Sequence, residues 1–127
     1  MAVKFLTDDW AKALAEACNA DAKFKKAIKG QQAVLQINVA GSPEAPGFTM
    51  TYGDGQVQVT TGTTDNPDIN LNLEYPTMIE LSKGTVNGPQ AMAGGRMTAV
   101  GNMEKMFSLG KAMDMLPSIE SNLGIEY

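Results

Sequence analysis

Residues that commonly carry catalytic chemistry are scarce in this sequence. The 127 residues include no histidine and a single cysteine, Cys18. A Ser-His-Asp or Cys-His nucleophile needs an imidazole base, and most catalytic zinc sites need at least one histidine. These enzyme classes are therefore excluded, and we expect no disulfide, metal or other cofactor. Cys18 lies on the apolar side of a predicted helix with no base beside it, which predicts an inert thiol.

Carboxylates are the main remaining route to catalysis. Asp65, Asp68 and Glu74 flank a predicted strand, and Asp65 and Asp68 would have to be brought together to act as acid and base. Carboxylates at the ends and polar side of a strand are normally solvated. Gly94-Gly95-Arg96 offers backbone N–H groups and a guanidinium to an anion, but a glycine pair before a strand more often marks close backbone approach. We therefore expect no catalytic residue and no enzymatic activity.

A group of methionines suggests non-covalent binding of apolar ligands instead. Seven of the nine methionines lie between residues 78 and 115. Methionine is flexible and polarizable, so it suits surfaces that accept variable apolar shapes, although it equally fills irregular cores. Physical reasoning alone favours the core filler, and the functional alternative is a cavity for a long apolar ligand. The candidate lining residues are Ile69, Leu71, Leu73, Met78, Leu81, Met97, Ala99, Met103, Met106, Phe107, Met113 and Leu116.

The distribution of charge excludes nucleic acid as a partner. Residues 1–30 carry six lysines and four acidic residues, whereas residues 31–82 carry six acidic residues and no basic one. Binding to phosphates requires many Lys and Arg side chains. A cluster on one short predicted helix, Lys23, Lys25, Lys26 and Lys29, is compatible with transient contact with an anionic membrane surface, although a solvated helix face is the commoner explanation. No segment has the apolar run of a signal peptide or membrane span, so we expect a cytoplasmic protein.

The apolar periodicity predicts the elements that position these residues. Helical spacing runs from Thr7, a candidate N-cap, to about Lys29, with Gly30 ending a second short helix. From Ala33 the period is two, which predicts four strands, and Gly53-Asp54-Gly55 predicts a tight hairpin between the second and third. The four predicted strands cover about 33–39, 48–52, 57–60 and 68–74.

The remaining elements are two short helices, a strand and a closing helix. Pro76 and Pro89 each open a short helix. Residues 96–100 alternate as a fifth strand. Asn102 caps a final helix that Pro117 is expected to stop or kink.

This order predicts a single α+β domain over residues 1–127. N-terminal helices occupy 1–30, a five-stranded, mostly antiparallel sheet with inserted helices occupies 33–101, and C-terminal helices occupy 102–123. Strand 68–74 is aliphatic on one side and polar on the other, so we expect helices to cover one face of the sheet and water to lie on the other.

Several motifs, in this order, resemble the sterol carrier protein type 2 (sterol-transfer) family. The resemblance runs from about Gln32 to Leu116 and is sharpest in Gly95-Arg96-Met97-Thr98-Ala99-Val100-Gly101-Asn102-Met103. Further motifs are Tyr52-Gly53-Asp54-Gly55-Gln56-Val57, Pro67-Asp68-Ile69-Asn70-Leu71-Asn72-Leu73 and Met78-Ile79-Glu80-Leu81-Ser82-Lys83-Gly84. The resemblance implies a sheet and helices that enclose a hydrophobic tunnel, which binds sterols, fatty acids, fatty acyl-CoAs or phospholipids without chemistry on them.

Two functions follow as hypotheses. The first is non-enzymatic binding or transfer of a lipid in the tunnel. The alternative is a structural or interaction module without a ligand, which dimerises through its apolar last helix. We expect a monomer or a homodimer.

Overall fold

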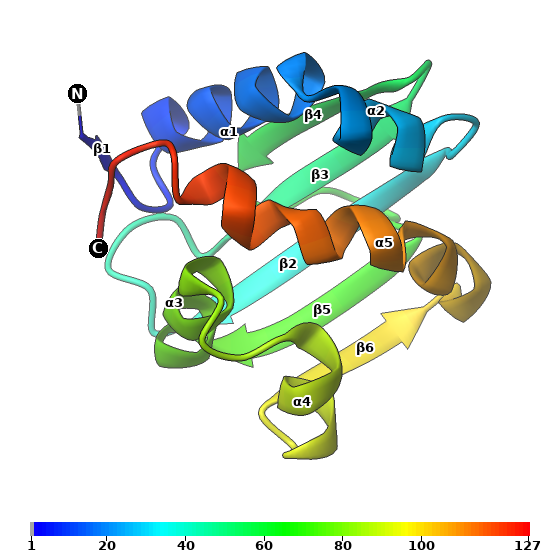
Figure 1. Cartoon of the computed structure of the whole chain (residues 1–127). Coiled ribbons are helices and arrows are strands. Elements are labelled where there is room, and N and C mark those ends of the chain that lie inside the picture. Colours follow the sequence, from blue (N-terminus) through cyan, green and yellow to red (C-terminus); the bar gives the residue numbers. More distant parts are fainter. Residues whose placement is uncertain (1) are drawn as a thin grey trace.

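The computed structural model describes residues 2–127, which form a five-stranded sheet with helices on one side and a separate two-stranded sheet (Figure 1). The sheet has the strand order β4-β3-β2-β5-β6. Only β2 and β5 are parallel, and the other neighbours are antiparallel. The expected α+β class and mostly antiparallel five-stranded sheet are therefore confirmed. The strands are β2 (Ala33–Ala40), β3 (Gly47–Gly53), β4 (Gln56–Thr61), β5 (Ile69–Glu74) and β6 (Met97–Gly101).

The helices divide the covered face of the sheet among them (Figure 1). α1 packs against β4, α4 packs beside β6, and α5 runs diagonally across the middle of the sheet. α2 packs against α1 and α5, and α3 against α5 and the ends of β2 and β5. Their bounds are α1 (Asp8–Ala20), α2 (Ala22–Ile28), α3 (Tyr75–Lys83), α4 (Gly88–Ala93) and α5 (Met103–Glu120).

Side-chain caps start two of these five helices where the sequence predicts them. Thr7 accepts a hydrogen bond from the Trp10 backbone N–H, and Asn102 accepts one from the Lys105 N–H. The Gly53-Asp54-Gly55 hairpin is also confirmed, because Asp54 (φ 53°) and Gly55 (φ 72°) both adopt the left-handed conformation of a tight two-residue turn.

The outer face of the sheet is less exposed to water than the sequence predicts. Gln36, on the polar side of β2, is only 2% exposed. Its Nε2 donates to the carbonyl oxygens of Gly62 and Phe48, and its Oε1 accepts from Thr49 Oγ1 and the Thr64 N–H. The chain leaving β4 must pass β3 and β2 to reach β5, and it does so over Gln36. The glutamine side chain thereby joins the Gly62 carbonyl oxygen and the Thr64 N–H of this crossover to the outer face of the sheet.

Of the two outcomes predicted at Pro117, a stop and a kink, the stop is wrong. α5 does not stop there but continues to Glu120, so residues 103–120 form one helix. Proline inside a helix removes one hydrogen bond and costs about 3 kcal/mol. The side chains of Leu109, Ala112 and Ile119 are buried on both sides of Pro117, and this packing offsets the cost.

The chain ends are joined by a contact that the sequence does not predict. β1 (Val3–Lys4) pairs in parallel with β7 (Ile125–Glu126), and the Phe5 N–H donates to the Glu126 carbonyl oxygen at 2.9 Å. Phe5 is fully buried, with its ring 5.1 Å from that of Trp10 and 5.0 Å from that of Tyr127. Strands of two residues have no detectable periodicity, so no sequence pattern could reveal this pair.

A carboxyl group is buried at the same end of the molecule. Glu120, at the end of α5, is 5% exposed, and its Oε1 has no hydrogen-bond partner among residues 2–127. Burial raises the pKa of Glu120 to about 7, an effect that nearby Ser82 and Trp10 oppose. The Ser82 hydroxyl itself lies 2.6 Å from the Tyr127 hydroxyl. Helix α3, helix α5 and the C-terminus therefore meet around one titratable group.

We predict that Glu120 makes the protein less stable as the pH rises. Folded Glu120 keeps its proton to about pH 7, but its ordinary pKa is 4.5, so the folded state binds more protons between these values. The free energy of unfolding should therefore fall across this window, by roughly 3 kcal/mol. Urea denaturation of wild type and E120Q at about pH 5 and about pH 8 measures this contribution.

E120Q, which carries no charge at residue 120, should be more stable than the wild type at about pH 8. The matched control, E126Q, changes an exposed carboxyl group on the neighbouring β7 and should keep the wild-type pH dependence. If the difference between wild type and E120Q were the same at both pH values, this explanation would be wrong.

Candidate functional site

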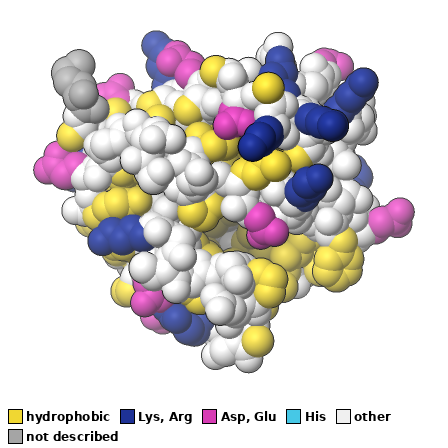
Figure 2. Space-filling view, in the orientation of Figure 1, with side chains coloured by type: hydrophobic (Ala, Val, Ile, Leu, Met, Phe, Trp, Pro, Cys, Tyr) yellow, Lys and Arg dark blue, Asp and Glu magenta, His cyan; other side chains and the backbone are white. Residues whose placement is uncertain are grey.

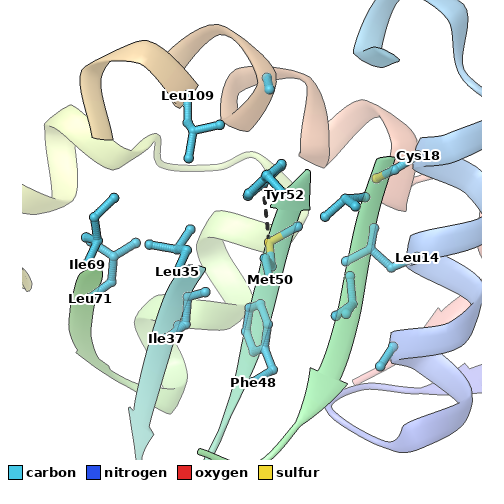
Figure 3. Packing of buried hydrophobic residues seen from close by; sticks show 14 of the residues in the cluster. Leu14, Cys18, Leu35, Ile37, Phe48, Met50, Tyr52, Ile69, Leu71 and Leu109 are labelled. Atoms are coloured by element: carbon cyan, nitrogen blue, oxygen red, sulfur yellow. Dashed lines mark hydrogen bonds between the residues drawn. The ribbon is translucent and has the colours of Figure 1, made fainter. Parts of the chain in front are cut away.

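An apolar surface lies between α5, α3 and α4 and the strands β5 and β6. Its floor consists of alternate side chains of β5, namely Ile69, Leu71 and Leu73, together with Met97 of β6, and all four are buried. The period of two predicted by the sequence places the β5 side chains on the face that the helices cover. Figure 3 shows Leu109 reaching from α5 toward this face, where Ile69 and Leu35 lie.

The walls of this surface are apolar side chains that are only half-buried. They pack against the buried core and keep part of their area in contact with solvent. Figure 2 shows hydrophobic side chains at the surface between α5 and α4, over β5. We call floor and walls together the apolar site. The wall residues are Met78 and Leu81 of α3, Ala99 of β6, and Met103, Met106, Met113 and Leu116 of α5.

The structure therefore brings together the residues that the sequence proposes for a cavity, with one exception. Phe107 is 77% exposed and does not belong to the buried cluster. At about 100° per residue, Phe107 lies roughly 200° around α5 from Leu109, which points to the sheet. The expectation that Phe107 faces inward is corrected for this reason. Whether the other residues contact a ligand stays a prediction.

A hollow of about 1020 Å³ adjoins the apolar site at one end of the sheet. It is open to water and lies where β2 and β5 end and β6 begins. Leu73 and Met97 belong to both the hollow and the apolar site, whereas Asn72, Thr98 and Arg96 give the hollow a polar side. The predicted lining residues other than Leu73 and Met97 do not line it, so the enclosed tunnel stays a prediction.

The charged groups near the apolar site have structural partners. Arg96, just before β6, forms an ion pair with Glu80 of α3. Asp68 accepts a hydrogen bond from the Val34 N–H at 2.7 Å through Oδ2, and its Oδ1 lies 3.3 Å from Lys105 Nζ. Both carboxylate oxygens of Asp68 are thus engaged in contacts that hold β2, β5 and α5 together. This arrangement does not resemble an acid–base pair.

The candidate carboxylates Asp65 and Glu74 are exposed to solvent, whereas the single cysteine is sequestered. Cys18 is fully buried, and burial raises the pKa of its thiol to about 12. The thiolate that a nucleophile or metal ligand requires is therefore not formed near neutral pH. Among residues 2–127, no three His, Cys, Asp or Glu side chains are grouped as a metal site would need. Within the same residues, no helix combines the length and apolar character needed to cross a bilayer.

Gly101 determines how β6 leads into α5. It has φ 129°, and a Cβ at this position would lie 2.2 Å from the Asp68 carbonyl oxygen. The same oxygen accepts a hydrogen bond from the Asn102 N–H at 2.8 Å. Only glycine allows this close approach, which sets the position of Met103 and the start of the wall. The sequence resemblance includes Gly101-Asn102-Met103 but does not reveal this physical role.

We predict opposite effects for alanine at two glycines of this region. G101A should lower the free energy of unfolding by more than about 2 kcal/mol, because the backbone of β5 blocks the new methyl group. In G110A, inside α5, the new Cβ meets nothing within 4 Å, so this variant should raise the free energy of unfolding by roughly 0.5–1 kcal/mol. Chemical denaturation of both variants tests this difference, and a G101A protein as stable as wild type would contradict it.

The comparison with family models assigns the chain to a known family. Residues 11–114 match the model of the SCP-2 sterol transfer family. The chain belongs to this family, so the predicted resemblance is confirmed. Family membership supports lipid binding or transfer as the general class of function. A search of curated proteins finds no match.

Solved structures share the fold at low sequence identity. A crystal structure of sterol carrier protein 2 superposes with a TM-score of 0.75 at 18% identity, covering 94% of this chain and 98% of that one. A conserved hypothetical protein from Thermus thermophilus, described as possibly a sterol carrier protein, gives a TM-score of 0.78 at 17% identity, covering 96% and 91%. The sec-alkylsulfatase Pisa1 from Pseudomonas sp. gives 0.57 at 16% identity, covering 71% of this chain and 14% of the enzyme. The fold therefore also occurs as part of larger enzymes.

Proposed function

We propose that the protein binds and transfers a lipid with a long apolar chain, such as a fatty acid, fatty acyl-CoA, sterol-like lipid or phospholipid, without chemical change to it. The observation that carries the proposal is the row of half-buried side chains along α5. Met103, Met106 and Met113 pack on a buried floor and still present apolar area to solvent. An alkyl chain seated against them removes that area from water.

The driving force is the area of hydrocarbon shielded from water. Each methylene buried contributes roughly 0.8 kcal/mol, so a long chain needs few directional contacts. Flexible methionines adapt to chains of different shape, which favours broad selectivity. The open hollow at Leu73 and Met97 has polar side chains next to one end of the apolar site. This arrangement supports one orientation of the ligand, with its head group toward the hollow. In this proposal the lipid head group lies there, near Arg96.

Displacement of a fluorescent fatty acid provides the direct test. M106W places a large ring on the wall of the apolar site and should weaken uptake by about tenfold or more, because the ring occupies space that the chain needs. S108W adds the same ring at an exposed position of the same helix and should leave uptake unchanged. M113W places the same ring about two turns further along α5 and should weaken uptake for the same reason.

The outcome depends on a comparison of folded variants. Thermal unfolding of M106W, M113W and S108W shows whether each is folded at the temperature of the assay. Uptake by folded M106W and M113W equal to that of wild type would exclude the apolar site as the binding site. Absence of uptake by the wild type itself would exclude fatty-acid binding as its function.

The alternative function is a dimerising module without a ligand. Phe107, which is 77% exposed on α5, is the side chain through which such a module would dimerise, because an extended apolar patch on a monomer marks an interaction site. Native mass spectrometry after mild purification distinguishes the two functions. The lipid carrier should retain a co-purifying small lipid in the monomer, whereas the module should be an empty dimer.

A further inference from the structure

The open hollow at the end of the sheet is lined mainly by uncharged polar groups. It has a volume of about 1020 Å³ and lies beside α3, where β2 and β5 end (Figure 1). Amide and hydroxyl side chains both donate and accept hydrogen bonds, so such a lining suits a neutral ligand that does the same. The uncharged polar lining residues are Asn38, Ser42, Thr63, Asn72, Thr77 and Thr98.

Two amides on neighbouring strands have fixed orientations in this hollow. The Asn38 Nδ2 group donates to Asn72 Oδ1 at 2.9 Å and to Asn70 Oδ1 at 3.2 Å, which uses both of its hydrogens. Asn38 and Asn72 are register partners in β2 and β5. Asn38 Oδ1 is therefore left as an acceptor beside Asn72 Nδ2, which is left as a donor. A ligand that satisfies both must carry a donor and an acceptor close together.

The start of α3 adds further hydrogen-bonding groups to the hollow. Glu74, Pro76 and Thr77 line it, and no side chain caps the N-terminus of this nine-residue helix. The N–H groups in the first turn of a helix have no partner within the helix. Thr77 is only 5% exposed, and its hydroxyl makes no hydrogen bond to another side chain or to the backbone within residues 2–127. This buried hydroxyl is therefore available to a ligand in the hollow.

The charges around the hollow do not favour an anion. Arg96 forms an ion pair with Glu80, and Lys4 Nζ lies 2.7 Å from Glu44 Oε1. Glu74 is exposed and forms no ion pair among the residues that the structure describes. A carboxylate or phosphate would thus meet one uncompensated negative charge and no free cation.

We propose that the hollow binds a neutral head group with neighbouring hydroxyl groups, such as the glycerol of a monoacylglycerol or the sugar of a glycolipid. This assignment rests on the proposed function and specifies the class of lipid. One hydroxyl donates to Asn38 Oδ1, and the next accepts from Asn72 Nδ2. A carboxylate has no donor for the first group, and an ammonium group has no acceptor for the second.

The head group belongs to a lipid because the hollow meets the apolar site. Leu73 and Met97 line the hollow and also form part of the apolar floor. A free polyol in this open hollow would exchange hydrogen bonds with water for similar bonds with the protein, which gives little net affinity. The alkyl chain supplies the affinity, and the hydroxyl groups decide which lipid is preferred.

Competition between ligands with the same acyl chain tests the proposal. Each ligand is used to displace a fluorescent fatty acid, below the concentration at which it forms micelles. At neutral pH, 1-lauroylglycerol should displace the probe at about tenfold lower concentration than laurate, because only the glycerol ester satisfies both amides. Free glycerol at the same concentrations should not displace the probe.

Alanine at two asparagines of β5 separates the hollow from the rest of the outer face. N72A removes a lining amide and should weaken binding of 1-lauroylglycerol about fivefold. N70A is the matched control, because Asn70 accepts from the same Asn38 amide but does not line the hollow. N70A should leave binding unchanged. Methyl laurate, which is neutral and has no hydroxyl group, should bind both variants as it binds the wild type.

Substitutions at the start of α3 test the remaining two arguments. T77V replaces the buried hydroxyl with a methyl group of similar size and should weaken 1-lauroylglycerol about fivefold without affecting methyl laurate. E74Q removes the uncompensated charge and should strengthen laurate binding about fivefold. Thermal unfolding shows that each variant is folded at the temperature of the assay.

The outcomes separate the head group from lipid binding itself. Equal displacement by laurate and 1-lauroylglycerol, or equal effects of N72A and N70A, would overturn the head-group assignment and leave the proposed function intact. Absence of binding of every acyl ligand by the wild type would overturn the proposed function. Binding of free glycerol as tight as that of 1-lauroylglycerol would assign the hollow to a free polyol and overturn its assignment to a lipid.

Discussion

The parallel pairing of β2 with β5 is the constraint on which the rest of the architecture depends. Two parallel neighbours cannot be joined by a tight turn, so the whole β3–β4 hairpin and a crossover lie between them in the chain. The crossover returns over the outer face and buries Gln36. It also places β5 and β6 on the side away from α1 and α2. The inner face of β5 and β6 is then left for α3, α4 and α5 to cover.

These three helices cover β5 and β6 incompletely, which gives the apolar site its character. α3 and α4 have only nine and six residues, and α5 crosses the sheet diagonally. Side chains such as Met103 and Met106 therefore pack on the core with one side and meet solvent with the other. A fully covering layer would have made the same methionines ordinary core residues. Incomplete cover leaves a partly exposed apolar surface made of residues whose type alone favours a filled core.

Opposite ends of α5 serve different purposes. Its first turns carry Phe107 and Lys105 toward solvent, next to the lysines of α2. Its last turn buries Glu120 near Trp10 and Ser82 and close to the paired chain ends. Packing is thus dense where the helix ends and open where it begins.

The sequence by itself determined the local elements and the class of protein. Alternation along β5, the caps at Thr7 and Asn102 and the hairpin at Asp54-Gly55 are local properties, so they were predictable. The apolar site was also largely predictable, because its members repeat at strand or helix periods. The tertiary structure alone decided the features that depend on distant neighbours. Phe107 points outward because Leu109 takes the sheet side of α5, and Gln36 is buried because the crossover passes above it. The helix continues through Pro117 because its packing outweighs the local preference of proline to end a helix. β1 pairs with β7 through contacts between distant segments, for which the local sequence has no signal.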